Sequence, residues 1–244
     1  GSVPRSGAQA PPPEGFDFQR ELGGRQDFDA RRGEVPPPAA ARRSAPGQTV
    51  RWNRFGTPQV VTAPGGFLAE GLPADPEQAA RRWITERADL FGQGAEAVAD
   101  LEPLRVAPVG EGHSVLLRQR FGGLPAGIDG TVGVAVVDGR VAHAWSSLTR
   151  DTALTGEVQL SAEEAVGAAT ADAGHEVRPA DIEAAPTADD EEWTVLAVDG
   201  IAEPVRARLV AVPTPLDGVR PAWETITLQP AEAEGLSHLV DAET

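Results

Sequence analysis

Histidines with neighbouring carboxylates are the residues that could give this chain a catalytic metal centre. A catalytic zinc site on a helix needs two histidines four residues apart and a glutamate beside the first, because this spacing turns both imidazoles to one side. The four histidines of the chain lie far apart in the sequence: His113, His143, His175 and His238. The pair His175-Glu176 begins the pattern, but Pro179 stands where the second histidine would be. We therefore predict no metal site.

Other catalytic groups are equally scarce. The chain has no Cys, and it contains no Gly-x-Ser-x-Gly motif to place a nucleophilic serine. The acidic run 189–192 lacks the alternation and the glycine of a calcium loop, so we interpret it as a solvated loop. A small enzyme using His143 and Asp129 is a weaker alternative, because nothing in the sequence pairs these two residues. We predict that the chain is not an enzyme and needs no cofactor.

The charge is distributed unevenly along the chain. Residues 1–47 contain 7 Arg and 6 acidic residues, residues 48–150 contain 10 and 11, and residues 151–244 contain 4 and 20. Almost all of the net charge of −16 therefore lies in the last third. Such a surface repels phosphate backbones, so we predict no nucleic-acid partner. It either keeps the protein soluble or matches a basic partner. No apolar run approaches the ~20 residues of a membrane span, so we predict no membrane partner.

The middle of the chain predicts one amphipathic helix followed by antiparallel strands. Asp75 is a suitable N-cap, Pro76 suits the first helical position, and Gly92 ends the pattern. The apolar positions recur at helical spacing: Ala80, Trp83, Ile84, Ala88 and Phe91. Two short strands precede the helix, at 49–52 and 58–62. After the helix, three alternating sets each share one face of a strand: Val115, Leu117, Gln119 and Phe121; Val132, Val134 and Val136; and, after the turn Asp138-Gly139, Val141, His143 and Trp145.

The last third repeats this order. Ser161 and Glu164 form a capping box for a helix that ends near Gly174. Strands are predicted at 193–198, 205–212 and 223–228. We therefore predict an α+β fold of two cystatin-like units, each a helix packed on an antiparallel sheet. The predicted domains are a Pro/Ala/Arg-rich arm at 1–47, a first unit at 48–156 and a second unit at 157–244.

Three aromatic residues in the arm are too many for a simple linker: Phe16, Phe18 and Phe28. We expect the arm to be flexible, with two interpretations of these residues left open. They anchor the arm on its own domain, or they dock on a partner and stay loose without it.

Three segments carry a resemblance to a known family: Val50-Arg51-Trp52-Asn53-Arg54-Phe55-Gly56-Thr57-Pro58, Ala88-Asp89-Leu90-Phe91-Gly92 and Arg118-Gln119-Arg120-Phe121-Gly122-Gly123-Leu124-Pro125. They resemble the propeptide of fungalysin-type, thermolysin-like zinc metallopeptidases. The resemblance implies a fungalysin/thermolysin propeptide module followed by a PepSY-like module, with no peptidase domain in the sequence. It also implies a secreted protein that inhibits the catalytic domain of its cognate zinc metallopeptidase and acts as its intramolecular chaperone.

The end of the chain resembles the closing strand of that family, which is followed by the enzyme. This implies that the cleft of the partner is bound by the last six residues: Leu239, Val240, Asp241, Ala242, Glu243 and Thr244. Asp241 or Glu243 would contact the partner's zinc, although Asp241 is equally consistent with a structural turn residue. The alternative is a free-standing secreted peptidase inhibitor or binding module with the same fold. A natural reading frame that continues into His-Glu-x-x-His would favour the propeptide.

Overall fold

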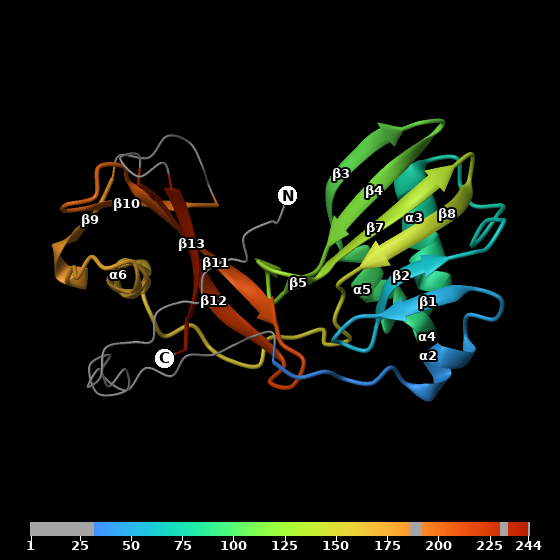
Figure 1. Cartoon of the computed structure of the whole chain (residues 1–244), viewed down its shortest axis with the longest axis horizontal. Helices are drawn as coiled ribbons and strands as arrows, with labels where there is room; N and C mark the ends of the chain where they lie inside the picture. The colour runs from blue at the N-terminus through green and yellow to red at the C-terminus, as the bar shows by residue number, and fades with distance from the viewer. Residues whose placement is uncertain (1–31, 186–191, 230–233, 244) are drawn as a thin grey trace, which may run out of the picture.

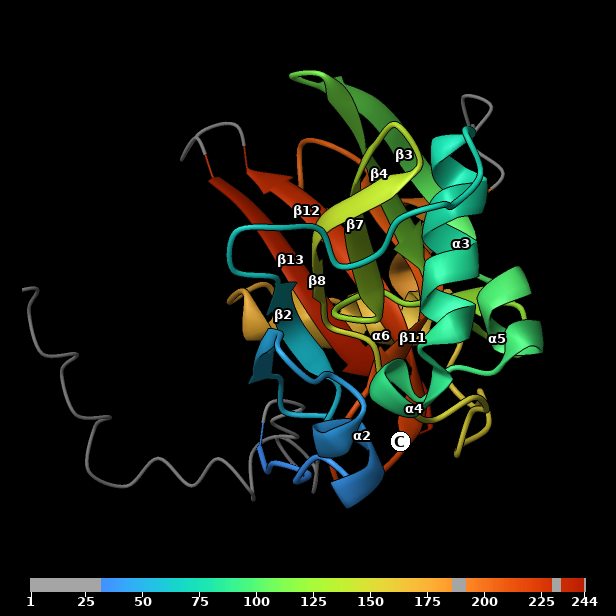
Figure 2. The same ribbon diagram turned by 90° about the vertical axis from the view of Figure 1, so that its right-hand side faces the viewer.

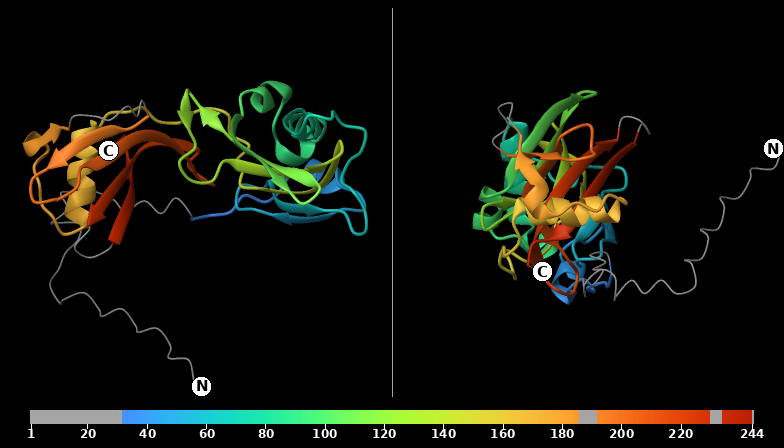
Figure 3. Two further views of the ribbon diagram at one scale, coloured as in Figure 1. Left: turned by 90° about the horizontal axis from the view of Figure 1, so that it is seen from above. Right: turned by 90° about the vertical axis from the view of Figure 1, so that its left-hand side faces the viewer.

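The computed structural model describes residues 32–185, 192–229 and 234–243, which form an α+β protein with antiparallel sheets. This confirms that the fold is α+β with antiparallel sheets, whereas the cystatin-like character of the two units stays a prediction. Two large sheets lie side by side along the long axis of the molecule (Figures 1 and 3). Within the described residues, no helix has the length and hydropathy needed to cross a membrane.

The first sheet has six strands and is covered by helices on one face. Its strands, in spatial order, are β1 (Thr49–Trp52), β2 (Pro58–Thr62), β8 (Arg140–Ser146), β7 (Thr131–Val137), β4 (Gly112–Arg118) and β3 (Glu102–Val109). The helices of this part are α2 (Ala39–Arg43), α3 (Pro76–Glu86), α4 (Ala88–Phe91) and α5 (Ala95–Ala99). Figure 2 shows α3 along one side of the strands, with α5 next to it and α4 below it. The sequence predicted β1 and β2 with these bounds, but β3 was not predicted.

The helix α3 begins as the sequence predicts. The side chain of Asp75 accepts a hydrogen bond from the backbone N–H of Gln78 at 2.8 Å, and Pro76 occupies the first turn. The prediction of one continuous helix to Gly92 is wrong, because Arg87 leaves the helical conformation with φ −112° and ψ 33°. A short second helix, α4, follows, and Gly92 ends it with a left-handed φ of 71°.

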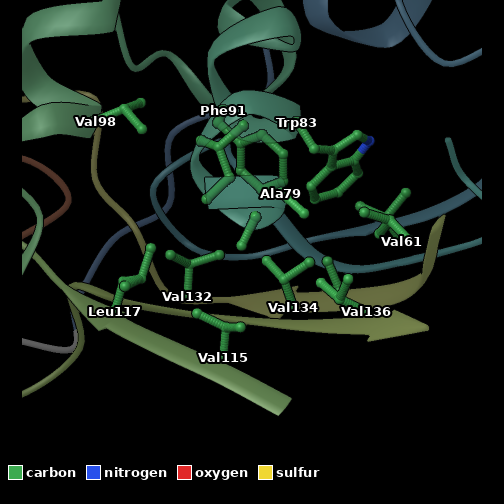
Figure 4. Packing of buried hydrophobic residues seen from close by; sticks show 14 of the residues in the cluster. Val61, Ala79, Trp83, Phe91, Val98, Val115, Leu117, Val132, Val134 and Val136 are labelled. Carbon is green, nitrogen blue, oxygen red and sulfur yellow. The ribbon is translucent and has the colours of Figure 1, made fainter. Parts of the chain in front are cut away.

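The first core lies between these helices and the first sheet (Figure 4). Trp83 and Phe91 pack edge to face, with ring centroids 5.3 Å apart at 74°. Below them lie the buried side chains of the three central strands: Val115, Leu117, Val132, Val134, Val136, Val141 and Ala144. Two aromatic rings and the aliphatic side chains of three strands, nearly all without exposed surface, therefore fill this core.

A β-bulge in β8 makes one sequence prediction wrong. Val136 pairs with Val141 and Ala135 pairs with His143, so the pairing register shifts between them and Ala142 is the additional residue. Val141 is fully buried, whereas Trp145 is 42% exposed on the opposite face. Val141 therefore does not share a face with His143 and Trp145, because an extra residue reverses the alternation of a strand.

The second sheet has five strands and one covering helix. Its strands, in spatial order, are β13 (Glu234–Asp241), β12 (Val219–Gln229), β11 (Val205–Pro213), β10 (Thr194–Val198) and β9 (Ile182–Ala184). The helix α6 (Ala162–Asp172) contacts β11, β12 and β13, and a short 3-10 helix, η1 (Pro179–Asp181), precedes β9. The capping box of α6 is confirmed: Ser161 Oγ accepts from Glu164 N–H at 3.2 Å, and Glu164 Oε2 accepts from Ser161 N–H at 2.8 Å.

The second core lies between α6 and the second sheet, and four of its ten buried members are alanines. Its buried members are Ala162, Ala165, Val166, Ile182, Leu196, Val198, Val205, Ala207, Trp223 and Ala242. Thr225 and Thr227 are also buried, and no hydrogen-bond partner is present for either hydroxyl or for Nδ1 of His238. The second core therefore contains buried polar groups that cost free energy.

A small apolar cluster joins the two sheets, and we call it the joint. It contains Phe121, Ala126, Ala211 and Val219, with Leu124 and Leu154 packed against it. Phe121 lies in β5 (Arg120–Phe121), which forms a hairpin with β6 (Leu124–Pro125). Although Val115, Leu117, Gln119 and Phe121 are all buried as predicted, they do not belong to one strand, because β4 ends at Arg118. Phe121 instead packs against residues of the second sheet.

Candidate functional site

The C-terminal segment, which the sequence singles out for partner binding, lies at one edge of the second sheet. Leu239, Val240 and Asp241 end β13, and β13 pairs with β12 on one side. Leu239 is 41% exposed, whereas Ala242 is fully buried. Thr244 lies outside the described residues. The segment is therefore presented by an edge strand, and its members differ in accessibility.

Arg220 binds both carboxylates of this segment. Its Nε donates to Oδ2 of Asp241 at 2.6 Å, and its Nη2 donates to Oε2 of Glu243 at 3.0 Å. The hydrogen bond with Asp241 raises the pKa of Arg220 above its ordinary value, against the opposing effect of burial. Asp241 Oδ1 also accepts from the backbone N–H of Glu243 at 2.9 Å. A partner's metal would therefore compete with Arg220 for either carboxylate.

Ala242 fixes the segment to the rest of the second sheet. Its N–H donates to the carbonyl of Pro221 at 3.0 Å, and its carbonyl accepts from Gln159 at 2.7 Å and from Leu160 at 2.9 Å. These bonds close the sheet against the chain that leads into α6. The sequence did not single out Arg220 or Pro221. The available signal was the scarcity of basic residues in this region: residues 151–244 contain 20 acidic residues and only 4 arginines, of which Arg220 is one.

The histidines are separated in space as well as in sequence. His143 is exposed on the uncovered face of the first sheet, His113 lines a hollow at the end of that sheet, and His175 follows α6. His238 Nε2 lies 3.3 Å from Oδ2 of Asp172 at the end of α6. Among the described residues, no group of three or more His, Asp or Glu side chains could hold a metal ion.

Asp129 is a carboxyl group beside the first sheet whose pKa departs from its ordinary value. It adopts a left-handed φ of 58° in the loop before β7. Burial raises its pKa above the ordinary value, although the charge of Arg54 and a hydrogen bond with Ser147 oppose the rise. The structure places Asp129 beside Ser147 and Arg54, and places His143 in β8 opposite Ala135. Asp129 and His143 therefore contact different neighbours.

The end of the first sheet nearest the β7–β8 turn has a hollow of about 370 Å³, near the lower end of the range for ligand sites. Its polar lining consists of Glu111, His113 and Asp138. All three belong to turns or strand ends, and no described hydrogen bond joins one of them to another. The hollow offers polar groups but no paired catalytic constellation.

The other predicted docking residues, Phe16, Phe18 and Phe28, lie outside the described residues. The segment 118–125, which carries part of the family resemblance, lies at the joint. Within it, Gln119 Nε2 donates to the carbonyl of Thr149 at 3.0 Å, and Gln119 Oε1 accepts from Thr149 N–H at 3.0 Å. This segment therefore connects parts of the chain to each other.

No family model matches the sequence, and the comparison with curated proteins gives no match. Among solved structures, the chain is similar to the Bacillus megaterium YpeB C-terminal domain, with 10% identity and a TM-score of 0.33 over 81% of this chain and 72% of that one. A similarity this low assigns neither fold nor function to the chain.

Proposed function

We propose that the chain acts as a non-catalytic propeptide that inhibits the catalytic domain of a secreted, fungalysin-type zinc metallopeptidase and assists its folding. In this interpretation the first sheet with α3 is a fungalysin/thermolysin propeptide module. The second sheet with α6 is a PepSY-like module, and both are cystatin-like units. The choice of this family rests on the resemblance of the segments 50–58, 88–92 and 118–125, and no comparison tests it.

One structural observation carries the proposal: the segment 239–243 lies at the outer edge of a sheet and carries two carboxylates held by one arginine. An extended segment can occupy a substrate cleft by pairing with its edge as a substrate would. In the proposed complex, Asp241 or Glu243 exchanges Arg220 for the partner's zinc or its bound water. While joined to the enzyme, such a segment would have an effective concentration on the order of mM, so a modest affinity suffices.

The test is an inhibition assay with a purified fungalysin-type catalytic domain. The double variant Asp241→Asn/Glu243→Gln keeps the shape of the segment and removes both charges. We expect its inhibition constant to rise by about tenfold or more, since a charged ligand to the zinc is lost. The matched control is Glu86→Gln on α3, whose carboxylate pairs with Arg82 at 2.8 Å on the other sheet. Absence of inhibition by the unmodified chain would refute the inhibitory role.

The chaperone role has a separate test. A template lowers the folding barrier by contacts made in the transition state. We therefore expect the yield of active enzyme to increase when the denatured catalytic domain is refolded with the chain. An equal yield without the chain would refute this part of the proposal.

A further inference from the structure

Among the four strands that end the two sheets, β13 has the least protected edge. The edge strand β3 contains Pro103 and Pro108, β9 has three residues, and β1 has four residues with an irregular register at Trp52. By contrast, β13 has eight residues, contains no proline, and carries acidic residues only at its two ends, Glu234 and Asp241. Prolines, charges and short length protect sheet edges from pairing with other chains. In the described part of the molecule, no strand pairs with the outer side of β13.

The hydrogen bonds to β12 determine which groups of β13 point outward. The N–H of Ala242 donates to the carbonyl of Pro221 at 3.0 Å. In an antiparallel ladder, hydrogen-bonded and non-hydrogen-bonded positions alternate. Counting back along the register from this bond, Gly235, Ser237 and Leu239 direct their N–H and C=O groups to the outer edge. These groups are available to a further strand.

The side chains beside this edge are apolar and accessible. Leu239 faces Glu224 across the ladder, so it shares a face with Ile226 and Leu228, which lie at two-residue spacing from Glu224. Leu239 is 41% exposed and Leu228 is 50% exposed. The helix α6 packs on the buried side of this sheet, where Trp223 lies. An added strand would therefore extend an apolar face as well as the ladder.

The charge around the edge selects the occupant. Residues 151–244 contain 4 Arg and 20 acidic residues. Two of the arginines on this sheet already bind carboxylates: Arg208 binds Glu224 at 2.7 Å, and Arg220 binds Asp241 at 2.6 Å. A second copy of the chain would bring the same acidic charge to the edge and be repelled. A strand with Arg or Lys alternating with apolar residues would be attracted.

We propose that the outer edge of β13 is a docking site for a partner's extended strand in which basic and apolar residues alternate. This deepens the proposed function, on which its assignment to a metallopeptidase rests, because it gives the partner surface a chemistry: an exposed basic strand. Backbone bonds to Gly235, Ser237 and Leu239 supply affinity, and the acidic surroundings supply the preference for a basic sequence.

The test uses Ser237→Pro, which removes one outward N–H and leaves charge and the bonds to β12 unchanged, since proline is tolerated on sheet edges. Ser237→Ala is the matched control. The probe is a fluorescein-labelled ten-residue peptide of alternating Val and Arg, with a Val/Glu peptide as its counterpart. We expect the basic peptide alone to bind, Ser237→Pro to weaken binding by about tenfold or more, and Ser237→Ala to leave it unchanged. Equal binding by a folded Ser237→Pro variant overturns the proposal.

Amide hydrogen exchange on the unmodified chain tests the docking site on β13 even if Ser237→Pro fails to fold. The amides of Gly235, Ser237 and Leu239 should exchange rapidly in the isolated chain and become protected by the basic peptide. Lack of protection overturns the proposal. If these amides are already protected in the isolated chain and their protection increases with protein concentration, a second copy of the chain occupies the edge. If they are already protected and the protection is lost when residues 1–31 are deleted, that segment occupies the edge. Either result also overturns the proposal.

The inhibition assay separates this inference from the proposed function. If the peptide protects the edge but the chain does not inhibit the catalytic domain, the docking site stands and the inhibitor role fails. If the unmodified chain and a folded Ser237→Pro variant inhibit equally, the inhibitor role stands and the edge is not the surface that the enzyme uses.

Discussion

The first and second cores differ in the side chains that fill them. In the first core, α3 buries Trp83 and Ile84. In the second core, the middle of α6 buries Ala165, Val166 and Gly167. Larger side chains remove more apolar area from water, at about 25 cal/mol per Å². We infer that the first sheet provides stability and that the second sheet, which presents the C-terminal segment, opens more readily.

Buried polar groups without a partner occur in both parts of the molecule, but they cluster only in the second sheet. The hydroxyls of Thr225 and Thr227 and Nδ1 of His238 have no hydrogen-bond partner on two neighbouring strands of the second sheet. Among the described residues, the other three such groups belong to the part of the chain that contains the first sheet and are spread along it: Gln48 Oε1, the indole N–H of Trp83 and Nε of Arg150. Each unpaired group costs about 1–3 kcal/mol when buried. Their concentration beside β13 places low local stability where a binding surface benefits from adaptability.

The largest expected effect tests the first core. Replacing Trp83 by Ala should lower the free energy of unfolding by about 3–5 kcal/mol, because a fully buried aromatic side chain is lost and a cavity remains. Urea denaturation monitored by circular dichroism measures the change. Trp145→Ala is the matched control, since Trp145 is 42% exposed on the uncovered face of the same sheet. An equal cost for both variants would contradict the assignment of the first core as the main source of stability.

The joint provides the next largest effect. Phe121 is 1% exposed and packs against Ala211 and Val219 of the second sheet, so Phe121→Ala should cost about 3 kcal/mol. Amide exchange should show that the second sheet opens separately from the first in this variant, since the joint couples them. Leu104→Ala, at a 41% exposed position of β3, is the control. Unchanged coupling would mean that the connection between the sheets lies elsewhere.

Two threonines should respond to the same substitution with opposite signs. Thr225→Val removes a buried hydroxyl without a partner, so we expect a gain of about 1 kcal/mol. Thr57→Val removes a buried hydroxyl that donates to the carbonyl of Leu148 and accepts from Asn53 at 2.7 Å, so we expect a loss of about 1–3 kcal/mol. Thermal unfolding of both variants measures the difference. A loss at Thr225 would show that its hydroxyl is satisfied in solution.

Local signals in the sequence predicted much of this fold. The caps at Asp75 and Ser161 and the turn Asp138-Gly139 were predictable because their residue types specify local geometry. The turn is confirmed by left-handed φ values of 49° at Asp138 and 68° at Gly139. Strand β3 was missed because Pro103 and Pro108 argue against a strand unless it lies at an edge, and edge position is set by the tertiary fold.

The candidate site was less predictable. The segment 239–244 followed from the family resemblance, but its pairing with Arg220 depends on contacts between residues more than twenty positions apart. The bulge at Ala142 likewise has no sequence signature, and it determines that Trp145 faces outward. Long-range register and ion pairing are properties of the assembled sheet, so residue patterns alone do not specify them.

A smaller effect tests the packing of α6. An added Cβ at Gly167 would meet Pro179 Cγ at 3.4 Å and Val177 O at 3.5 Å, which is ordinary contact. Gly167→Ala should therefore raise the free energy of unfolding by about 0.5–1 kcal/mol through helix propensity. Gly133→Ala is the counterpart in the first sheet, where an added Cβ would collide with the ring of Trp145. Denaturation in urea should show opposite signs; a loss at Gly167 would mean that α6 is already tightly packed.

The smallest expected effect concerns carboxyl groups, whose surroundings differ between the two sheets. Asp241 and Glu243 in the second sheet pair with Arg220, whereas burial raises the pKa of Asp129 beside the first sheet above its ordinary value of 3.8. A raised pKa in the folded state means that the folded chain holds the proton more tightly than the unfolded chain. Its contribution to stability is therefore complete below pH 3.8 and is lost as the pH rises through the folded-state pKa.

Asp129→Asn removes this titration while keeping a residue that tolerates left-handed φ. We expect the variant to be more stable than the unmodified chain at pH 7 and equal to it near pH 3, with the difference reduced by solvent screening because Asp129 is partly exposed. Urea denaturation across this pH range measures the difference. Ser114→Ala, on the uncovered face of the same sheet, is the control and should change the free energy of unfolding by the same amount at pH 3 and at pH 7. A variant less stable at pH 7 would mean that attraction to Arg54 outweighs burial, so that Asp129 would resemble the paired acids of the second sheet.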